Sequence, residues 1–117
     1  MQRSLYLLVS SLVLASPLAR GAEAGVFQQM SFTVDGVART ALVYVPSTAK
    51  SSPTPLVFVF HGHGGNARQA ARSFAMDRQW PEAISVYMQG LDTPGQLTDS
   101  QGNRPGWQAA IGDQGGS

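Results

Sequence analysis

The feature that most restricts the fold of this chain is a continuous apolar run at residues 56–60 (LVFVF), which ends directly in a glycine-rich turn. Continuous runs of β-branched and aromatic residues are typical of strands that are covered on both faces, as in parallel sheets with helices on each side. Asn66 follows the turn and is a favourable N-cap, so a helix is expected from Ala67 toward Met76 or Trp80. Its apolar side would carry Ala70, Ala71, Phe74 and Ala75.

A second short apolar run, residues 83–88 (AISVYM), predicts another buried strand and completes a right-handed βαβ unit, so the fold class is α/β. Ahead of this unit, residues 29–34 and 37–45 alternate between apolar and polar side chains, with the hairpin-turn dipeptide Asp35-Gly36 between them. Alternation leaves one face of a strand wet. We therefore expect this hairpin at the edge of the sheet.

Residues 89–108 are polar and rich in Gly, Pro, Asp and Asn, which predicts a long loop. Loops of this length inside a compact domain are usually functional or disordered. This one follows the C-terminal end of a parallel strand, where open α/β sheets bind their ligands.

The beginning of the chain predicts export. Arg3 is followed by an apolar run at residues 5–15 that is too short to cross a membrane, and Ala22 and Ala24 form an AxA cleavage pattern. Residues 1–24 are therefore interpreted as a signal peptide, and the protein as extracellular or periplasmic without stable membrane anchoring.

Charge and cysteine content restrict the partners. Removing Arg3, Arg20 and Glu23 with the leader reduces 8 basic and 7 acidic residues to 6 of each, scattered along the chain, which argues against nucleic acid or an anionic membrane as partner. There is no cysteine, so an exported domain must depend on a buried core. Because the chain stops at Ser117 after a flexible run, we expect residues 25–117 to be the incomplete N-terminal half of a larger domain.

The chemistry is expected in the turn His61-Gly62-His63-Gly64-Gly65. When a nucleophile attacks an ester carbonyl, backbone N–H groups aimed at the oxygen stabilise its growing charge, and losing one such donor costs about a hundred- to a thousandfold in rate. Glycines allow the sharp turn and bring N–H groups close to a substrate. We predict the N–H of His63, or of the adjacent Gly64, as this donor, while His61, Gly62 and Gly65 support the loop.

The turn has three other interpretations. An HxH pair can bind a metal, but the chain has no third histidine and no thiol, so we expect no metal site. A phosphate loop is disfavoured because neither GxGxxG nor GxxxxGK[ST] occurs, and no cofactor is expected. A purely structural tight turn stays open, since glycine-rich turns are common in βα units.

Four segments, residues 39–46 (RTALVYVP), 55–65 (PLVFVFHGHGG), 86–91 (VYMQGL) and 103–108 (NRPGWQ), together resemble the polyhydroxybutyrate depolymerase and feruloyl esterase-like family of secreted α/β-hydrolases. The resemblance implies an α/β-hydrolase fold that starts with an edge β-hairpin and a βαβ unit. It also implies a carboxylic-ester hydrolase acting on a polyester or a polysaccharide-linked ester through a Ser-His-Asp triad, with the serine on a GxSxG elbow.

Nucleophile, acid and base are all expected outside this chain. Ser117 is not taken as the nucleophile, because the residues before it are polar and flexible instead of an apolar strand. His61 is not taken as the base, since the base follows the nucleophile in this fold. Two positions depart from the family pattern: His63 stands where relatives often carry Cys, and Met88 where they usually carry Pro.

Trp107 has two interpretations: an apolar wall for an acyl or aromatic group of the substrate, or an aromatic side chain that packs the loop onto the sheet. Two other functions also remain as alternatives. The first is a short exported binding protein that keeps the loop without catalysis, and the second an acyltransferase or peptidase on the same fold. The oligomeric state is left open.

Overall fold

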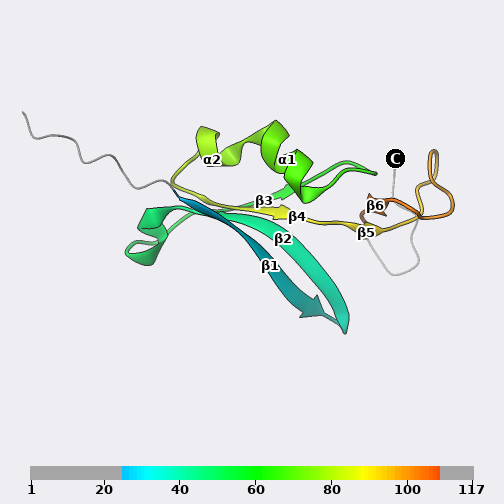
Figure 1. The fold of residues 1–117 in the computed structure, drawn as a ribbon, viewed down its shortest axis with the longest axis horizontal. Coiled ribbons are helices and arrows are strands. Elements are labelled where there is room, and N and C mark those ends of the chain that lie inside the picture. The colour runs from blue at the N-terminus through cyan, green and yellow to red at the C-terminus, as the bar shows by residue number, and fades with distance from the viewer. Residues whose placement is uncertain (1–24, 109–117) are drawn as a thin grey trace, which may run out of the picture.

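The structure, a computed structural model, describes residues 25–108 as a mixed α/β arrangement with one main sheet (Figure 1). Its strands follow the order β1-β2-β4-β3, where only the pair β3 and β4 is parallel. The strands are β1 (Val26–Val34), β2 (Val37–Val45), β3 (Leu56–Phe60) and β4 (Ile84–Met88). The remaining elements are the 3-10 helix η1 (Ser47–Lys50), the helices α1 (Ala67–Phe74) and α2 (Met76–Gln79), and the short strands β5 (Leu91–Asp92) and β6 (Pro105–Gly106).

The predicted hairpin is confirmed, although β1 begins at Val26 and not at Gln29. Asp35 and Gly36 both have positive φ, 50° and 77°, which is the two-residue turn whose twist matches that of paired strands. The placement of both strands at the sheet edge is only half right. β2 also pairs with β4, so β1 alone is the edge strand on this side.

The parallel pairing of β3 and β4 is confirmed, with Phe58 opposite Val86, and α1 lies in the connection between them. The expectation that β3 is covered on both faces is wrong for residues 25–108. Both helices lie on one face of the sheet (Figure 1), and successive side chains of a strand point to opposite faces. Val59 therefore packs under α1, whereas Leu56, Phe58 and Phe60 stay more than half exposed.

The core under the helices is small and depends on Tyr87. This side chain of β4 is fully buried against alanines of α1, and its hydroxyl accepts a hydrogen bond from the backbone N–H of Met76 at 2.9 Å. Burial raises the pKa of the phenol, although contacts with the backbone of Met76 and Asp77 act in the opposite direction. The members of this core are Val59, Ala67, Ala70, Ala71 and Tyr87.

The predicted cap of α1 is confirmed, since the side-chain oxygen of Asn66 accepts a hydrogen bond from the N–H of Gln69 at 2.9 Å. The helix ends at Phe74 because Ala75 is left-handed, with φ 46°, and α2 follows at once. Ala70, Ala71 and Ala75 are buried as expected. Phe74 is not: it is half exposed.

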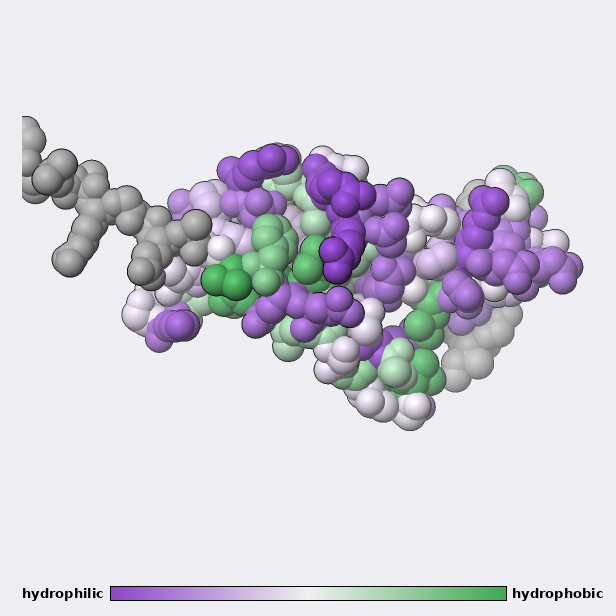
Figure 2. Space-filling view, viewed as in Figure 1, coloured by the Kyte–Doolittle hydropathy of each residue, from purple (hydrophilic) through white to green (hydrophobic). Residues whose placement is uncertain are grey.

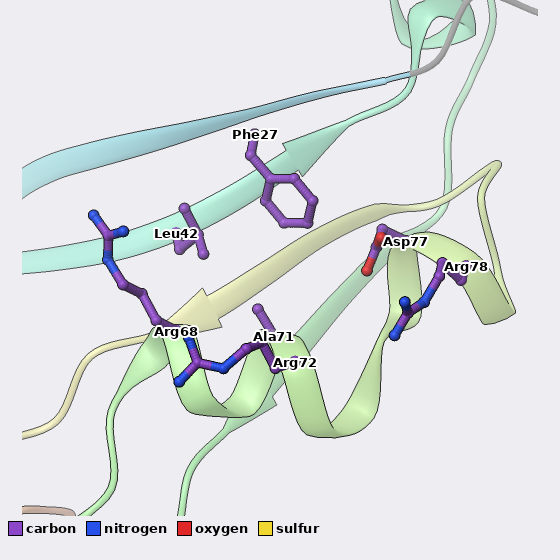
Figure 3. A pocket seen from close by; sticks show the side chains of 7 residues that line it. All are labelled: Phe27, Leu42, Arg68, Ala71, Arg72, Asp77 and Arg78. Atoms are coloured by element: carbon purple, nitrogen blue, oxygen red, sulfur yellow. The ribbon is translucent and has the colours of Figure 1, made fainter.

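The side of the hairpin that faces the helices is open. Phe27 of β1 and Leu42 of β2 point toward α1 (Figure 3), and apolar residues reach the surface between hydrophilic ones on this side (Figure 2). The ring of Phe27 is held against Tyr44, with centroids 5.3 Å apart. The helices thus cover only part of their own side of the sheet.

Residues 89–108 are more ordered than a long loop. Strands β5 and β6 pair as a small antiparallel sheet, with Leu91 opposite Gly106, and a further bridge joins Gly95 to Asp99. A side chain at Gly90 would come within 2.6 Å of the carbonyl oxygen of Gly106, so this close approach requires glycine.

The predicted signal peptide and Ser117 lie outside the described residues. Among residues 25–108, no helix has the length and apolar character needed to cross a membrane.

The face of the sheet opposite the helices predicts self-association of the chain. This face carries exposed Met30, Phe32, Leu56 and Phe58 around a hollow of about 430 Å³, and uncovered apolar patches of this kind favour aggregation. We expect Phe58→Lys to reduce association in sedimentation experiments. Phe74→Lys, which changes an equally exposed phenylalanine on the helix side, is the control. Equal association of both variants and the parent would contradict this role of the face.

Candidate functional site

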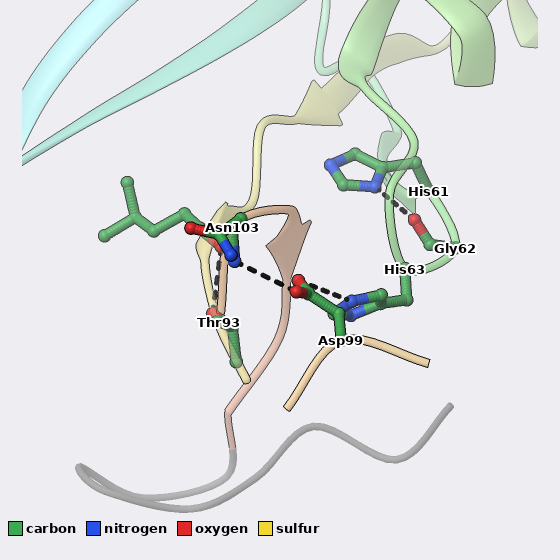
Figure 4. A network of polar contacts seen from close by, with 7 residues as sticks. His61, Gly62, His63, Thr93, Asp99 and Asn103 are labelled. Atoms are coloured by element: carbon green, nitrogen blue, oxygen red, sulfur yellow. Dashed lines mark hydrogen bonds and ion pairs between the residues drawn. The ribbon is translucent and has the colours of Figure 1, made fainter. Parts of the chain in front are cut away.

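The turn at residues 61–65 leaves the C-terminal end of β3, leads into α1, and faces the region of β5 and β6 (Figure 4). Parallel strands end at the same edge of a sheet, so the segment that follows β4 meets the segment that follows β3 here. Gly64 has φ 76°, a left-handed conformation that glycine adopts without strain. This geometry places the glycine-rich turn and the predicted ligand-binding loop in direct contact.

His61 is a structural anchor of this contact. It is only 6% exposed, and its Nε2 accepts a hydrogen bond from the backbone N–H of Gly90 at 3.0 Å. An accepting Nε2 carries no hydrogen, so the neutral ring carries its hydrogen on Nδ1 and donates it to the carbonyl oxygen of Gly62 at 2.7 Å. With both ring nitrogens engaged, His61 ties the end of β3 to the segment after β4 and has no free nitrogen to accept a substrate proton.

His63 makes its contacts with the far part of the loop. Its Nε2 donates to a carboxylate oxygen of Asp99 at 3.3 Å, and both side chains are largely buried, 10% and 7% exposed. The ring also lies against Gly106, where an added Cβ would approach Nδ1 to 2.7 Å. The imidazole of His63 therefore holds the loop against the turn, which leaves the backbone of His63 as the part that can serve a ligand.

Asp99 organises the loop around itself. Its carboxylate accepts from the N–H of Asn103 at 3.1 Å, and its backbone oxygen accepts from Gly95 and Gly102. Desolvation alone would raise the pKa of Asp99, but hydrogen bonds from the backbone of Asn103 and Arg104, together with His63, outweigh it and lower the pKa. The carboxylate is thus stabilised in its charged form.

Two of the backbone N–H groups of the turn are bonded within the protein and cannot serve a ligand. Gly64 donates to the carbonyl oxygen of Pro105 at 2.8 Å, and Gly65 donates to that of Gly62 at 2.9 Å. Gly64 is therefore corrected from a candidate donor to a residue that ties the turn to β6. The N–H groups of His63 and Gly62 have no acceptor among residues 25–108, and His63 remains the candidate donor.

Trp107 packs the loop onto the end of β3. Its indole N–H donates to the carbonyl oxygen of His61 at 2.7 Å, and its ring meets Phe60 edge-on with centroids 5.0 Å apart. Trp107 also lines a cavity of about 460 Å³ together with Phe32 and Met88. Neither His63 nor Gly64 lines this cavity. Trp107 thus both packs the loop onto the sheet and forms part of an apolar cavity wall, so both interpretations of this residue stay open. The cavity itself does not reach the turn.

Sequence reasoning missed four groups that shape the site: Gln89, Gly90, Asp99 and Pro105. Gln89, Gly90 and Pro105 belong to the segments 86–91 and 103–108 that carry the family resemblance, but no role was predicted for them, and Asp99 lies in no quoted segment. Gln89 bonds the backbone N–H of Ala67 at the start of α1 through its side-chain oxygen, at 3.1 Å. Such partners are found only once the chain is folded, because they are 22 or more residues from the groups they bind.

Within the described part of the chain, no cluster of three or more His, Asp or Glu side chains is arranged to hold a metal ion. Comparison of the chain with models of protein families, with curated proteins and with solved structures finds no match. The site is therefore interpreted from its own geometry.

The left-handed conformation of Gly64 predicts a difference between two glycines of the turn. Gly64→Ala should destabilise the folded chain by about 1 kcal/mol, because an L-residue with a side chain is strained at φ 76°. Gly62→Ala is the matched control, since a Cβ there meets open space. Denaturant unfolding of the two variants measures the difference, and equal stabilities would show that Gly64 is not constrained.

The lowered pKa of Asp99 predicts that the loop loosens in acid. A carboxylate whose pKa is lowered by folding stabilises the fold above its ordinary pKa, about 4, and this contribution is lost as the pH falls through the lowered value. The protection factors of the Gly64 and Asn103 amides, which compare the measured exchange rate with the intrinsic rate at the same pH, should then fall in NMR hydrogen-exchange measurements. Asp99→Asn, which has no carboxylate to protonate, should remove this pH dependence. A profile that is unchanged in the variant would contradict the role of Asp99.

Proposed function

We propose that this chain is the N-terminal section of a secreted serine carboxylic-ester hydrolase with an α/β-hydrolase fold, and that the N–H of His63 supplies one donor of its oxyanion hole. The observation that carries the proposal is the place of the N–H of His63, which, like that of Gly62, has no acceptor among residues 25–108. It lies in the turn between the third strand and the first helix, in a section where the neighbouring N–H groups of Gly64 and Gly65 are bonded internally.

The position of the turn supports this assignment. α/β-hydrolases build the oxyanion hole from an N–H in the turn after the third strand and from the N–H that follows the nucleophile. The turn is held from several directions, by the bonds of His61 to Gly90, of Gly64 to Pro105 and of His63 to Asp99. Rigid placement matters, because a donor stabilises a transition state only when it needs no reorganisation during the reaction.

The proposed reaction assigns this chain one role. A serine outside the chain passes its hydroxyl proton to the base and attacks the ester carbonyl, the electron pair of the C=O bond moves onto the oxygen, and the N–H of His63 donates to that oxygen. Collapse of the tetrahedral intermediate expels the alcohol, which takes its proton from the base, and water then releases the acid in a second round. The imidazole of His63 takes no proton in this scheme, since it serves the contact with Asp99.

The substrate class follows from the resemblance. The apolar wall of Phe32, Met88 and Trp107 suits a portion of the ester remote from the scissile carbonyl, because this cavity does not reach the turn. A polyester, a feruloyl ester and an acetylated polysaccharide all remain within this class. No cofactor takes part in the proposal.

The proposal predicts the effect of removing the N–H of His63. The open reading frame is extended past Ser117 and searched for an apolar strand that leads into GxSxG, and the encoded protein is assayed on p-nitrophenyl, feruloyl and polyester substrates. His63→Pro lacks the N–H and should lower kcat by about a hundred- to a thousandfold with little change in KM.

The control is His63→Ala, which keeps the N–H and loses the contacts of the ring with Asp99 and Gly106. Its kcat should stay well above that of His63→Pro. Equal kcat values in the two variants would remove the donor role from His63. A protein that contains no elbow and hydrolyses none of the esters would instead favour a binding module, the main alternative.

A further inference from the structure

A groove on the helix side of the sheet, remote from the turn after β3, has the character of a ligand site. It lies between the hairpin and the two helices (Figure 3) and has a volume of about 370 Å³, within the range of small-molecule sites. Its lining comes from β1, β2, α1 and α2 and consists of Phe27, Leu42, Arg68, Ala71, Arg72, Asp77 and Arg78.

The floor of this groove is apolar. Phe27 and Leu42 extend from neighbouring strands toward Ala71 of α1. Phe27 is 44% exposed although it packs against Tyr44, so one side of its ring is left for a ligand. An apolar group placed here would gain burial without displacing any described residue.

The rim of the groove is basic. Arg68 and Arg72 lie four residues apart on α1, and Arg78 extends from α2, against a single acidic residue, Asp77. None of the three arginines forms an ion pair within residues 25–108. Three of the six basic residues in 25–117, which are scattered along the sequence and exposed as expected, thus line one groove.

This arrangement is unfavourable for the empty protein. Like charges four residues apart on a helix repel each other, and no carboxylate except Asp77 is present in the groove to offset them. A bound anion would relieve the repulsion. Guanidinium groups suit this role, because they donate paired hydrogen bonds to the oxygens of carboxylates and phosphates.

We propose that this groove binds a small amphiphilic anion, in which a carboxylate or phosphate group contacts the arginines and an apolar group lies on Phe27 and Leu42. The site does not depend on the proposed ester hydrolysis. Its volume suits an apolar portion of the size of one aromatic ring with a short linker, and its charge selects for the anionic end.

The test uses the full chain with three probes: 4-phenylbutyrate, its uncharged counterpart 4-phenylbutanol, and inorganic phosphate. NMR titration follows the side-chain Nε–H signals of the arginines and contacts between the phenyl protons and Phe27. Saturable binding of 4-phenylbutyrate is expected, about tenfold or more tighter than that of either other probe, and weaker as salt is added.

Two double variants separate the groove from general charge. Arg68→Gln with Arg72→Gln should weaken binding of 4-phenylbutyrate about tenfold or more. Lys50→Gln with Arg104→Gln removes the same charge outside the groove and should leave binding unchanged. Circular dichroism shows whether each variant keeps its fold, and Leu42→Ser tests the floor independently by weakening the carboxylate probe while sparing phosphate.

Several results would overturn the site. They are no saturable binding, equal affinity for the carboxylate and the alcohol, phosphate binding as tightly as 4-phenylbutyrate, or equal losses in the two double variants. Equal affinity for the alcohol would indicate apolar binding only, and equal affinity for phosphate a simple anion site.

Discussion

The hydrogen bond from the backbone N–H of Gly90 to the ring of His61 is the contact on which the site depends. It joins the segment that follows β3 to the segment that follows β4, just beyond the point where the pairing of these two parallel strands ends. Because the bond occupies Nε2, it also determines which nitrogen carries the hydrogen, and the other nitrogen then closes the turn onto Gly62. His61 in the glycine-rich turn thus serves as a clamp between the two segments.

The other contacts of the turn build on this clamp. Trp107 reaches the carbonyl oxygen of His61, Gly64 reaches Pro105, and His63 reaches Asp99, so the loop after β4 is laid over the turn from three directions. Of these bonds, that of Gly64 to Pro105 takes up a backbone N–H that is a candidate donor from the sequence alone. Fewer residues of the turn therefore remain as candidate donors than the motif implies. The remaining candidate, His63, is held in place by the bonds of its neighbours.

The two faces of the sheet differ in what covers them. Small alanines let α1 lie close over Tyr87 and Val59, which buries one side of β3 and β4. The same helices leave the hairpin beside them open, and the opposite face carries phenylalanine and leucine side chains that no described element covers. The strands are paired although their apolar faces are only partly covered. Pairing needs only a neighbouring strand, whereas covering an apolar face needs a second layer of structure.

Much of the local structure could be predicted from the sequence, because its signals are local. Asp35 and Gly36 form the turn of the hairpin, Asn66 caps α1, and the two apolar runs correspond to β3 and β4. Predictions of burial were less reliable. A run such as residues 56–60 fits a strand covered on both faces, but whether a cover exists depends on elements elsewhere, and Phe58 stays exposed for this reason.

The sequence by itself determined where the turn of the candidate site begins and why its backbone can bend, since glycine alone adopts such conformations without strain. Only the tertiary structure decided which N–H groups remain free, because their acceptors lie in distant segments: Pro105 takes that of Gly64, and no described group takes that of His63. It also gathered Arg68, Arg72 and Arg78 at one groove. Along the chain these arginines are separate charges, and the helical repeat and the break at Ala75 bring them together.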